Sequence, residues 1–425
     1  MFIIFALVLL GAMGFSIVLP SIMFVAEDFG GGEAMAGWIV ASYAIGQLIA
    51  TPVWGRLSDR YGRKLILAAC SACTMIAFLG LAFAYDALTL FLSRLAGGLA
   101  GGLFSVSQAW VADTTTPRNR AKGMGIMGAG ISLGFILGPF VGGLLGGGSV
   151  ETASLLQPGL LGAALAAVLL IVILVFMRES LPPEKRMAAQ PFAAEMRQWG
   201  AVSKRPAVSR LLVLGLLWMT AAGMFEVMMP LWVGDKLDWG PRHVGAQFLY
   251  LGLLVAVIQG FVAGRLSQRF GEVPVIGAGI VFYAAGLLII ANFGMVAAGP
   301  FAPDPLRDAV GALSMGDVLA DLAGRPWLLL GLGSLAGGSS LLVPNISSLV
   351  SKYASVSERG TVLGLFQSSQ WLGRTVSPPI GGALFQEQGA NAPLYGSVLV
   401  LIPCLAGLLV WFGGSRAQPH KEVEA

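Results

Sequence analysis

Three ionisable side chains lie inside long runs of apolar residues, where charge is costly. Arg94 lies in one run, Glu226 in a second and Arg374 near the middle of a third. A charged side chain in hydrocarbon costs about 2.5 kcal/mol or more, so such residues persist where they pair, line water or carry out a function. The chemistry open to a lone carboxylate among apolar neighbours is the uptake and release of a proton.

Glu226 is the strongest candidate for that proton chemistry. Desolvation favours its protonated form, whereas a nearby arginine would favour its charged form. A carboxylate balanced between these influences is suited to loading a proton on one side of a membrane and releasing it on the other. The alternative is a structural glutamate that pairs with an arginine or extends to the surface. The apolar neighbours of this carboxylate are Met219, Met224, Phe225, Met228 and Met229.

The two arginines are candidate partners in proton coupling. Arg374 is either a counter-charge for Glu226 or for a substrate, or an arginine bonded to helix carbonyls of its own half of the chain. At 1.5 Å of rise per residue, Arg94 and Glu226 lie about 9 and about 10 Å from the outer ends of their runs. Their depths therefore match, and we assign Glu226, Arg94 and Arg374 to proton coupling.

The composition places these residues in a membrane. Of the 425 residues, 56% are hydrophobic and only 11% are charged, and the mean hydropathy is +0.79. A soluble domain has about 25% charged residues, so this chain has too little charge for a water-facing surface of its size. We expect an all-α protein that crosses the membrane many times. The net charge of +4 does not indicate nucleic-acid binding, because membrane proteins collect Lys and Arg in cytoplasmic loops.

Apolar runs of about 20 residues are candidate transmembrane helices. The sequence contains twelve, in two sets of six. They lie near residues 2–24, 37–57, 64–84, 88–111, 123–146 and 158–177, then 209–233, 245–264, 274–296, 327–350, 361–384 and 392–413. We expect two pseudo-symmetric six-helix bundles. The first covers residues 1–177, a cytoplasmic linker covers 178–208, and the second bundle with a cytoplasmic tail covers 209–425.

The distribution of basic residues predicts the orientation of these helices. Most of the 26 Lys and Arg residues lie in the loops after even-numbered runs and in the C-terminal tail. Loops rich in Lys and Arg stay in the cytoplasm, so we expect both termini to be cytoplasmic.

A short charged loop is repeated in the two halves. It covers Gly55–Lys64 after the second run, and a weaker copy at Gly264–Gly271 follows the eighth run. Acidic and basic residues at the cytoplasmic ends of runs 2 and 4 form a predicted charge latch, a bistable element that protonation or substrate can bias. The members of this latch are Gly55, Asp59, Arg60, Gly62, Arg63, Asp113, Arg118 and Arg120.

The fifth run carries a ridge of glycines. Residues spaced four apart lie on one helix face, and bare positions there let a second membrane helix approach closely. The eleventh run has a similar series at Ser369, Gly373, Ser377 and Gly381. Two such helices at equivalent places suggest halves that rock against each other. The predicted packing motif of the fifth run consists of Gly130, Gly134, Gly138, Pro139, Gly142 and Gly143.

Three motifs make the chain similar to the major facilitator superfamily, in its twelve-span drug/proton antiporter branch. Residues 55–64 match the cytoplasmic loop signature of that superfamily in nearly every position. Residues 90–98, with Arg94, resemble the fourth-helix signature, and residues 134–143 resemble the fifth-helix signature of antiporters. The resemblance covers the whole chain, since all twelve runs fit.

Further positions narrow the resemblance within that branch. Phe225-Glu226 and its surroundings resemble exporters of quinolones and other amphiphilic drugs, in which a glutamate at the matching place takes part in proton coupling. Tetracycline exporters are also similar in helices 1 to 5, but their aspartate in helix 1 and histidine in helix 8 have no counterpart here. The resemblance implies that Arg94 faces Glu226 across a central cavity. It also implies that the latch holds the two halves together in the outward-open state.

A pocket for varied amphiphiles needs adaptable apolar walls with a few polar groups. Methionine, aromatic and amide side chains on helices that would line the central cavity supply both kinds of surface. The candidate substrate-binding residues are Tyr43, Gln47, Ser105, Gln108, Met224, Phe225, Met228, Asn345, Gln367 and Gln370.

The sequence therefore predicts a proton-coupled antiporter that exports lipophilic, cationic drugs or similar small molecules by alternating access. We expect a monomer in the bacterial inner membrane whose partners are a small-molecule substrate, protons and the lipid bilayer, without nucleic acid. We expect no enzyme activity, no metal and no cofactor, because the sequence has no catalytic constellation, no P-loop and only two histidines. Alternatives are an exporter of a specific metabolite, siderophore or sugar, or a non-transporting receptor or scaffold.

Overall fold

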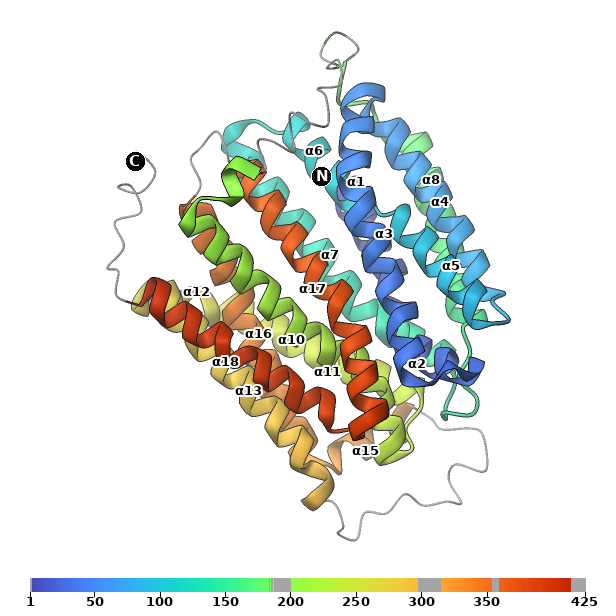
Figure 1. The fold of residues 1–425 in the computed structure, drawn as a ribbon. Helices are drawn as coiled ribbons and strands as arrows, with labels where there is room; N and C mark the ends of the chain where they lie inside the picture. The colour runs from blue at the N-terminus through green and yellow to red at the C-terminus, as the bar shows by residue number, and fades with distance from the viewer. Residues whose placement is uncertain are drawn as a thin grey trace. The chain divides into compact units, whose positions relative to one another are not determined.

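The computed structural model describes residues 2–182, 184, 186, 200–296, 315–353 and 359–413. The regular structure within these ranges is helical (Figure 1). Ten helices in the described ranges are long and apolar enough to cross a membrane by length and composition. One of them, Ile3–Tyr61, covers the first two predicted runs, and the eleventh run forms the more polar helix α17 (Arg359–Gln388). Each of the twelve predicted crossings is therefore helical.

The helices of the first half agree with the predicted runs, although the first and fourth runs are interrupted and the second and fifth are extended. The first and fourth runs each form two helices in series. The bounds are α1 (Phe2–Ser16), α2 (Leu19–Ala26), the wide turn η1 (Glu27–Gly31), α3 (Gly32–Tyr61), α4 (Arg63–Ala82), α5 (Ala87–Leu99), α6 (Leu103–Thr114), α7 (Pro117–Gly146) and α8 (Leu156–Phe176).

The second half repeats this arrangement of long helices. A short helix, α15, precedes the tenth predicted run. The bounds are α10 (Pro206–Leu237), α11 (Pro241–Ile258), the wide turn η3 (Gln259–Ala263), α12 (Gly264–Phe270), α13 (Glu272–Val296), α15 (Met315–Ala323), α16 (Pro326–Lys352), α17 (Arg359–Gln388) and α18 (Ala392–Phe412). Much of the predicted linker (183, 185 and 187–199) and the predicted tail (414–425) lie outside the described residues.

The chain divides into two compact units. The first contains Met1–Gln190, Met229–Leu249 and Asp304–Val318, and the second contains Pro191–Met228, Tyr250–Pro303 and Leu319–Ala425. Helices α10 and α11 contribute residues to both units, because each crosses one of these boundaries.

In the first unit, the glycine ridge of α7 packs directly on α1. A Cβ added at Gly134 would lie 2.7 Å from the carbonyl oxygen of Leu9, and one added at Gly142 would collide with the carbonyl oxygen of Ile17. Helix backbones approach this closely only where side chains are absent, as the sequence predicts. The neighbouring Gly143 faces the start of α11, where a Cβ would lie 2.5 Å from the carbonyl oxygen of Pro241.

Small residues also join the other helices of this unit. Helices α4 and α8 lie side by side (Figure 1), and Gly162 of α8 leaves room for the ring of Phe78. Helices α3 and α5 meet at Gly46 and Gly98, where each glycine approaches the backbone of the other helix. Close backbone contact stabilises membrane helices by van der Waals packing. The positions of α3, α4 and α5 are thereby fixed relative to one another.

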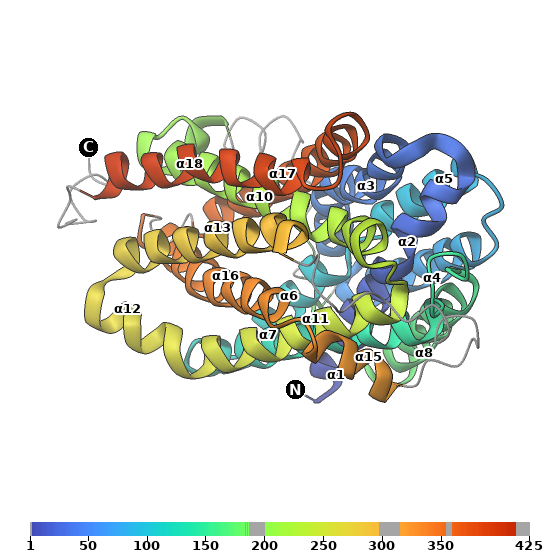
Figure 2. The ribbon, with the colours of Figure 1, turned by 90° about the horizontal axis from the view of Figure 1, so that it is seen from below.

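The second unit is packed by the same principle. Helix α13 lies between α16 and α18 (Figure 2). A Cβ added at Gly338 of α16 would lie 2.6 Å from the carbonyl oxygen of Gly279 of α13. Gly373 of α17 approaches the carbonyl oxygen of Leu216 of α10 at 2.9 Å by the same measure. The predicted series on the eleventh run is therefore a helix-packing face, here against α10.

Two interruptions of the first unit's helices have local causes. Gly30 and Gly32 adopt φ of 83° and 64° at the corner before α3, a region that favours glycine. The fourth run is broken at Gly101, whose carbonyl oxygen accepts a hydrogen bond of 2.8 Å from Nε2 of Gln47. Gln47 is 3% exposed, so this bond is internal. The break between α5 and α6 is thus held by a side chain of α3.

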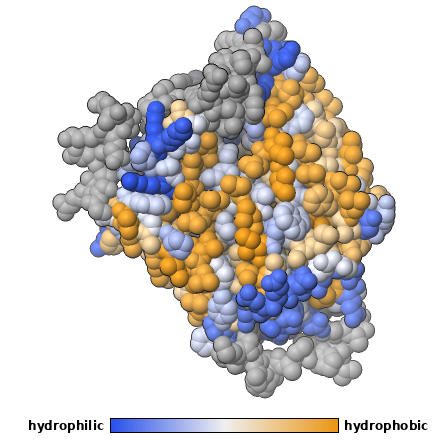
Figure 3. All heavy atoms as spheres, in the orientation of Figure 1, coloured by the Kyte–Doolittle hydropathy of each residue, from blue (hydrophilic) through white to orange (hydrophobic). Residues whose placement is uncertain are grey.

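Apolar side chains cover most of the helical surface, and hydrophilic ones gather toward the ends of the helices (Figure 3). Such a surface is stable against lipid rather than water.

Of the three cysteines, Cys70 and Cys404 are buried and Cys73 is exposed on α4.

Candidate functional site

Glu226 of α10 and Arg374 of α17 form an ion pair within the second unit. Nη2 of Arg374 lies 2.8 Å from Oε2 of Glu226, and Nη1 lies 3.4 Å from Oε1. This two-pronged geometry is the strong form of an arginine–carboxylate contact. The two side chains are 26% and 21% exposed, so the pair is largely but not wholly removed from solvent. The structure thus pairs Arg374 with Glu226, and the role of this pair in proton coupling stays a prediction.

Aromatic side chains surround this pair. Tyr283 of α13 is 5% exposed and close enough to interact electrostatically with both Glu226 and Arg374. Its ring meets Trp218 edge-on at a centroid distance of 4.8 Å and Phe225 at 6.4 Å. These aromatic contacts stabilise the packing of α10 against α13 beside Glu226.

Two predicted substrate residues of α10 are part of the packed interior. Met224 and Met228 are each 1% exposed. Their side chains fill the space beside Gly381, and Met224 also contacts the space beside Gly396. A flexible thioether chain suits such irregular gaps.

Arg94 of α5 has different surroundings in the first unit. It is 3% exposed, and its Nε is buried without a hydrogen-bond partner among the described residues. Its guanidinium lies over the ring of Tyr43, 4.7 Å from the centroid. Arg94 and Glu226 belong to different units, and the expectation that they face one another stays a prediction.

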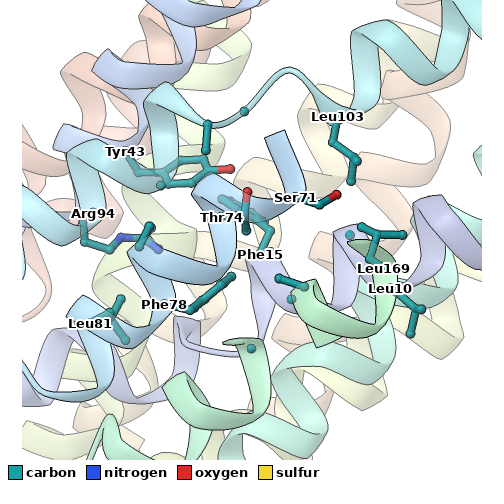
Figure 4. Close-up of a pocket in the computed structure, with 18 of the residues that line it drawn as sticks. Leu10, Phe15, Tyr43, Ser71, Thr74, Phe78, Leu81, Arg94, Leu103 and Leu169 are labelled. Carbon is teal, nitrogen blue, oxygen red and sulfur yellow. The ribbon is translucent and has the colours of Figure 1, made fainter. Parts of the chain in front are cut away.

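Arg94 and Tyr43 both line a cavity of about 50 Å³ within the first unit. Figure 4 shows Arg94 reaching inward beside the Tyr43 ring, with the hydroxyls of Ser71 and Thr74 farther in. Apolar side chains form most of the remaining wall. Those labelled in Figure 4 are Leu10, Phe15, Phe78, Leu81, Leu103 and Leu169. Ser71, Thr74 and Ser93, which lie in the wall, are hydroxyls that the sequence analysis did not select, because small polar residues are common in membrane helices.

Some of the other predicted substrate residues are buried or hydrogen-bonded within the protein, and others are partly or fully exposed. Asn345 is 4% exposed, donates to the carbonyl oxygen of Leu341 at 2.6 Å and accepts from Ser267 at 2.6 Å. Ser105 donates to the carbonyl oxygen of Gly102 at 3.1 Å. Gln108 and Gln367 are exposed, and Gln370 is half-buried. Phe225 is 6% exposed against Tyr283. Their role in substrate binding stays a prediction.

Part of the predicted latch is an ion cluster centred on Arg63. Nη1 of Arg63 lies 2.6 Å from Asp59 and donates to Ser58, and Nε lies 3.1 Å from Asp113 at the end of α6. The Arg63 side chain is 9% exposed, whereas Asp113 is 25% and Asp59 is 50% exposed, so the cluster is buried at the arginine and open to solvent at Asp59. Gly62, with φ of 102°, ends α3 and turns the chain into α4.

The remaining latch residues are placed less tightly. The guanidinium of Arg60 lies over the ring of Tyr61 at 5.2 Å, and Gly55 faces open space in α3. Arg118 and Arg120 belong to α7, but their side chains lie outside the described part of the chain. The gating role of the latch stays a prediction.

Glu179 is a functional neighbour of the latch that the sequence analysis missed. Its carboxylate accepts from the backbone N–H of Arg63 at 2.8 Å and of Lys64 at 3.2 Å, which are the first residues of α4. Carboxylates are stabilising at helix N-termini because the N–H groups there lack intrahelical partners. The sequence signal was weak, because Glu179 lies 116 residues from the helix it caps.

The family model described as Major Facilitator Superfamily matches residues 1–302 and 260–425 of the chain. The chain is 27% identical to the tetracycline resistance protein, class C, of Escherichia coli over 414 residues, which cover 94% of each chain. It is 28% identical to major facilitator superfamily domain-containing protein 10 of Mus musculus over 415 residues, covering 91% of this chain and 80% of that protein.

Solved transporter structures share the fold. A crystal structure of the human organic anion transporter MFSD10 has a TM-score of 0.67 and 23% identity, covering 96% of this chain and 98% of that one. A D-xylose–proton symporter has a TM-score of 0.74 and 17% identity, covering 98% and 99%. The family match spans the chain and agrees with the loop and helix motifs, so this protein is a transporter rather than an enzyme. The chain belongs to the major facilitator superfamily.

Proposed function

We propose that the protein exports lipophilic small molecules of the drug type from a bacterial cell in exchange for protons. The observation that carries this proposal is the Glu226–Arg374 pair, a carboxylate inside a membrane helix that is still 21% exposed. When Glu226 takes up a proton, its attraction to Arg374 is lost, so the α10–α17 contact depends on protonation. The tetracycline resistance proteins among the relatives support drug export as the task.

The two six-helix bundles predicted from the sequence repeat support a cycle of alternating access. Protonation of Glu226 would bias one state and its release the other, so that the proton gradient supplies the driving force without a cofactor. Orientation with both termini in the cytoplasm follows from the basic loops. Location in the inner membrane, a monomeric state and the cationic charge of the substrate remain predictions of the sequence.

Transport by the purified protein in liposomes tests this function. A pH gradient is imposed, and the movement of tetracycline and of a fluorescent lipophilic cation is followed in wild type and in Glu226→Gln. We expect gradient-driven movement to fall at least tenfold in the variant, because an amide cannot carry the proton. Exchange of labelled for unlabelled substrate without a gradient should persist, since binding and alternation need no net proton transfer.

Glu272→Gln is the matched control. Glu272 is also a carboxylate in an ion pair, with Lys352 at 2.6 Å, but it lies at the first residue of α13. Coupled transport should survive in this variant. Full gradient-driven transport by Glu226→Gln would contradict the proposed coupling site, and the absence of transport of any probe would favour a defined metabolite as substrate.

A further inference from the structure

Among the residues that the structure describes, Arg94 is a buried cation without a counter-charge. The side chain is 3% exposed, and its Nε lacks a hydrogen-bond partner within the described chain. Its one electrostatic neighbour there is Tyr43, whose ring lies 4.7 Å from the guanidinium carbon. A cation–π contact offsets only part of the cost of removing a guanidinium from water. Arg94 therefore lacks the anion that would complete its surroundings.

The space beside Arg94 fits a small charged group. About 50 Å³ of the cavity is open to the centre of a water-sized sphere, several times the roughly 10–15 Å³ that one water needs by this measure. It therefore has room for a carboxylate or a similar acid group. Thr74 adds a hydroxyl to a wall that is otherwise largely apolar, whereas the Ser71 hydroxyl already donates to the carbonyl oxygen of Leu67 at 2.9 Å (Figure 4). This combination suits an acid group whose attached body is lipophilic.

The broken fourth helix adds an independent indication of a ligand site. Ala100, Gly101 and Leu103, which surround the break between α5 and α6, all line the same cavity. Secondary transporters build substrate sites from discontinuous helices, because interrupted backbone is tolerated in a membrane where it lines a cavity. Gln47 holds the carbonyl of Gly101, so the break is a fixed part of the wall.

The charges of Glu226, Arg374 and Arg94 favour an acidic ligand over a basic one at this cavity. The carboxylate of Glu226 is already occupied by Arg374 at 2.8 Å. Within the described chain the buried Nε of Arg94 has no hydrogen-bond partner and lies at this cavity, and its positive sign repels a cation. We propose that this cavity binds the acid group of an amphiphilic organic anion, with Arg94 as its counter-charge. As an assignment of substrate class this rests on the proposed export function, and it is an alternative to the cation expected from the sequence.

Equilibrium binding tests the inference without transport. The protein in nanodiscs of phosphatidylcholine is titrated with pyrenebutyrate, with its uncharged amide and with the corresponding pyrene amine, and binding is measured by energy transfer from tryptophan. The three probes share one lipophilic body. We expect wild type to bind the acid at least tenfold more tightly than the amide, and the amine least tightly. Equal binding of acid and amide, or preference for the amine, would overturn the proposal.

Variants of Arg94 test whether this side chain is the source of the preference for the acid over the amide. Arg94→Gln should lose the preference for the acid while its affinity for the amide stays within twofold, and Arg94→Lys should keep part of the preference. An equal loss for acid and amide in both variants would show that Arg94 only supports the shape of the site. Thermal unfolding of each variant identifies any that fails to fold. Arg94→Lys, which keeps the charge, then decides the outcome.

Two further arms separate this inference from the proposed function and from lipid binding. Glu226→Gln should keep the preference for the acid over the amide even if its affinity for both probes changes with the balance of states, so a failure of proton coupling leaves the preference intact. Nanodiscs that contain phosphatidylglycerol test whether a lipid phosphate takes the same site. Unchanged binding of the acid supports a substrate site, whereas its displacement would overturn the substrate assignment in favour of an anionic lipid.

Discussion

The two halves of this chain each place one arginine inside apolar helices, and the surroundings of the two arginines are opposite. Arg374 meets a carboxylate at 2.8 Å, whereas Arg94 meets an aromatic ring and an open cavity. The scaffold around them is similar, because α7 on α1 and α17 on α10 both pack through small residues. A repeated scaffold can therefore hold a saturated charge in one half and an unsatisfied charge in the other.

A second contrast occurs at the repeated loops. Arg63 follows Gly62 at the start of α4 and binds Asp113 at the end of α6. In the second half Glu272 follows Gly271 at the start of α13 and binds Lys352 at the end of α16. The contact recurs with its charges exchanged. The fold thus specifies an ion pair at this place, and either order of charges satisfies it.

The largest expected effect concerns the two small-residue ridges. A Cβ at Gly142 collides with the backbone of Ile17, whereas a Cβ at Gly381 meets the side chains of Met224 and Met228 at 2.9 Å. Backbone cannot give way as a methionine can, so Gly142→Ala should cost more than the roughly 1–3 kcal/mol typical of overpacking. Gly381→Ala should cost less. Thermal unfolding in detergent compares the two, and equal losses would contradict the asymmetry.

Removal of the two arginines should have opposite consequences for stability. Arg374→Met leaves Glu226 without its partner and should destabilise the protein by about 1–3 kcal/mol. Arg94→Met removes an unpaired buried charge and should leave stability unchanged or raise it. Thermal unfolding without ligand measures both. The double variant Glu226→Gln with Arg374→Met should recover part of the loss, whereas a similar loss in Arg94→Met would indicate an internal partner for Arg94.

The smallest expected effect concerns the two ion pairs at the repeated loops, whose charges are exchanged between the halves. Arg63 is 9% exposed and binds two carboxylates, so Arg63→Gln should cost about 1–2 kcal/mol. Lys352 is 49% exposed, and after solvent screening Lys352→Gln should cost no more than about 0.5 kcal/mol. Chemical unfolding of both variants tests the order. The swap of Glu272→Lys with Lys352→Glu should match wild type if the order of charges is interchangeable.

Much of the fold could be predicted from the sequence, because apolar runs of membrane-spanning length and glycines four apart are local signals. Glu226 and Arg374 can each be recognised from the sequence, because a charged side chain inside an apolar run is energetically costly. Their pairing, across 148 residues, depends on how α10 and α17 are rotated about their axes. Runs that are apolar on nearly all sides carry little information about that rotation.

The same lack of information about helix rotation explains why the sequence does not identify the substrate-binding residues reliably. Tyr43 lines the cavity, but Met224 and Met228 are packed against Gly381, and Asn345 is engaged by Ser267. Residue type alone does not separate a wall of a cavity from a packed face. The break at Gly101 was missed because its run is long and apolar throughout.

The placement of the three thiols makes the native chain suitable for spectroscopy. Cys70 and Cys404 are buried, and Cys73 is exposed near the middle of the membrane-spanning helix α4, so we expect only a lipid-soluble maleimide to label folded protein, at Cys73. That residue precedes Thr74 of the cavity wall on α4, and a fluorophore there would report on occupancy from the outer face of the helix. With Cys73 replaced by alanine, pairs of introduced cysteines in the two units would allow spin-label distance measurements through the transport cycle while both buried thiols remain.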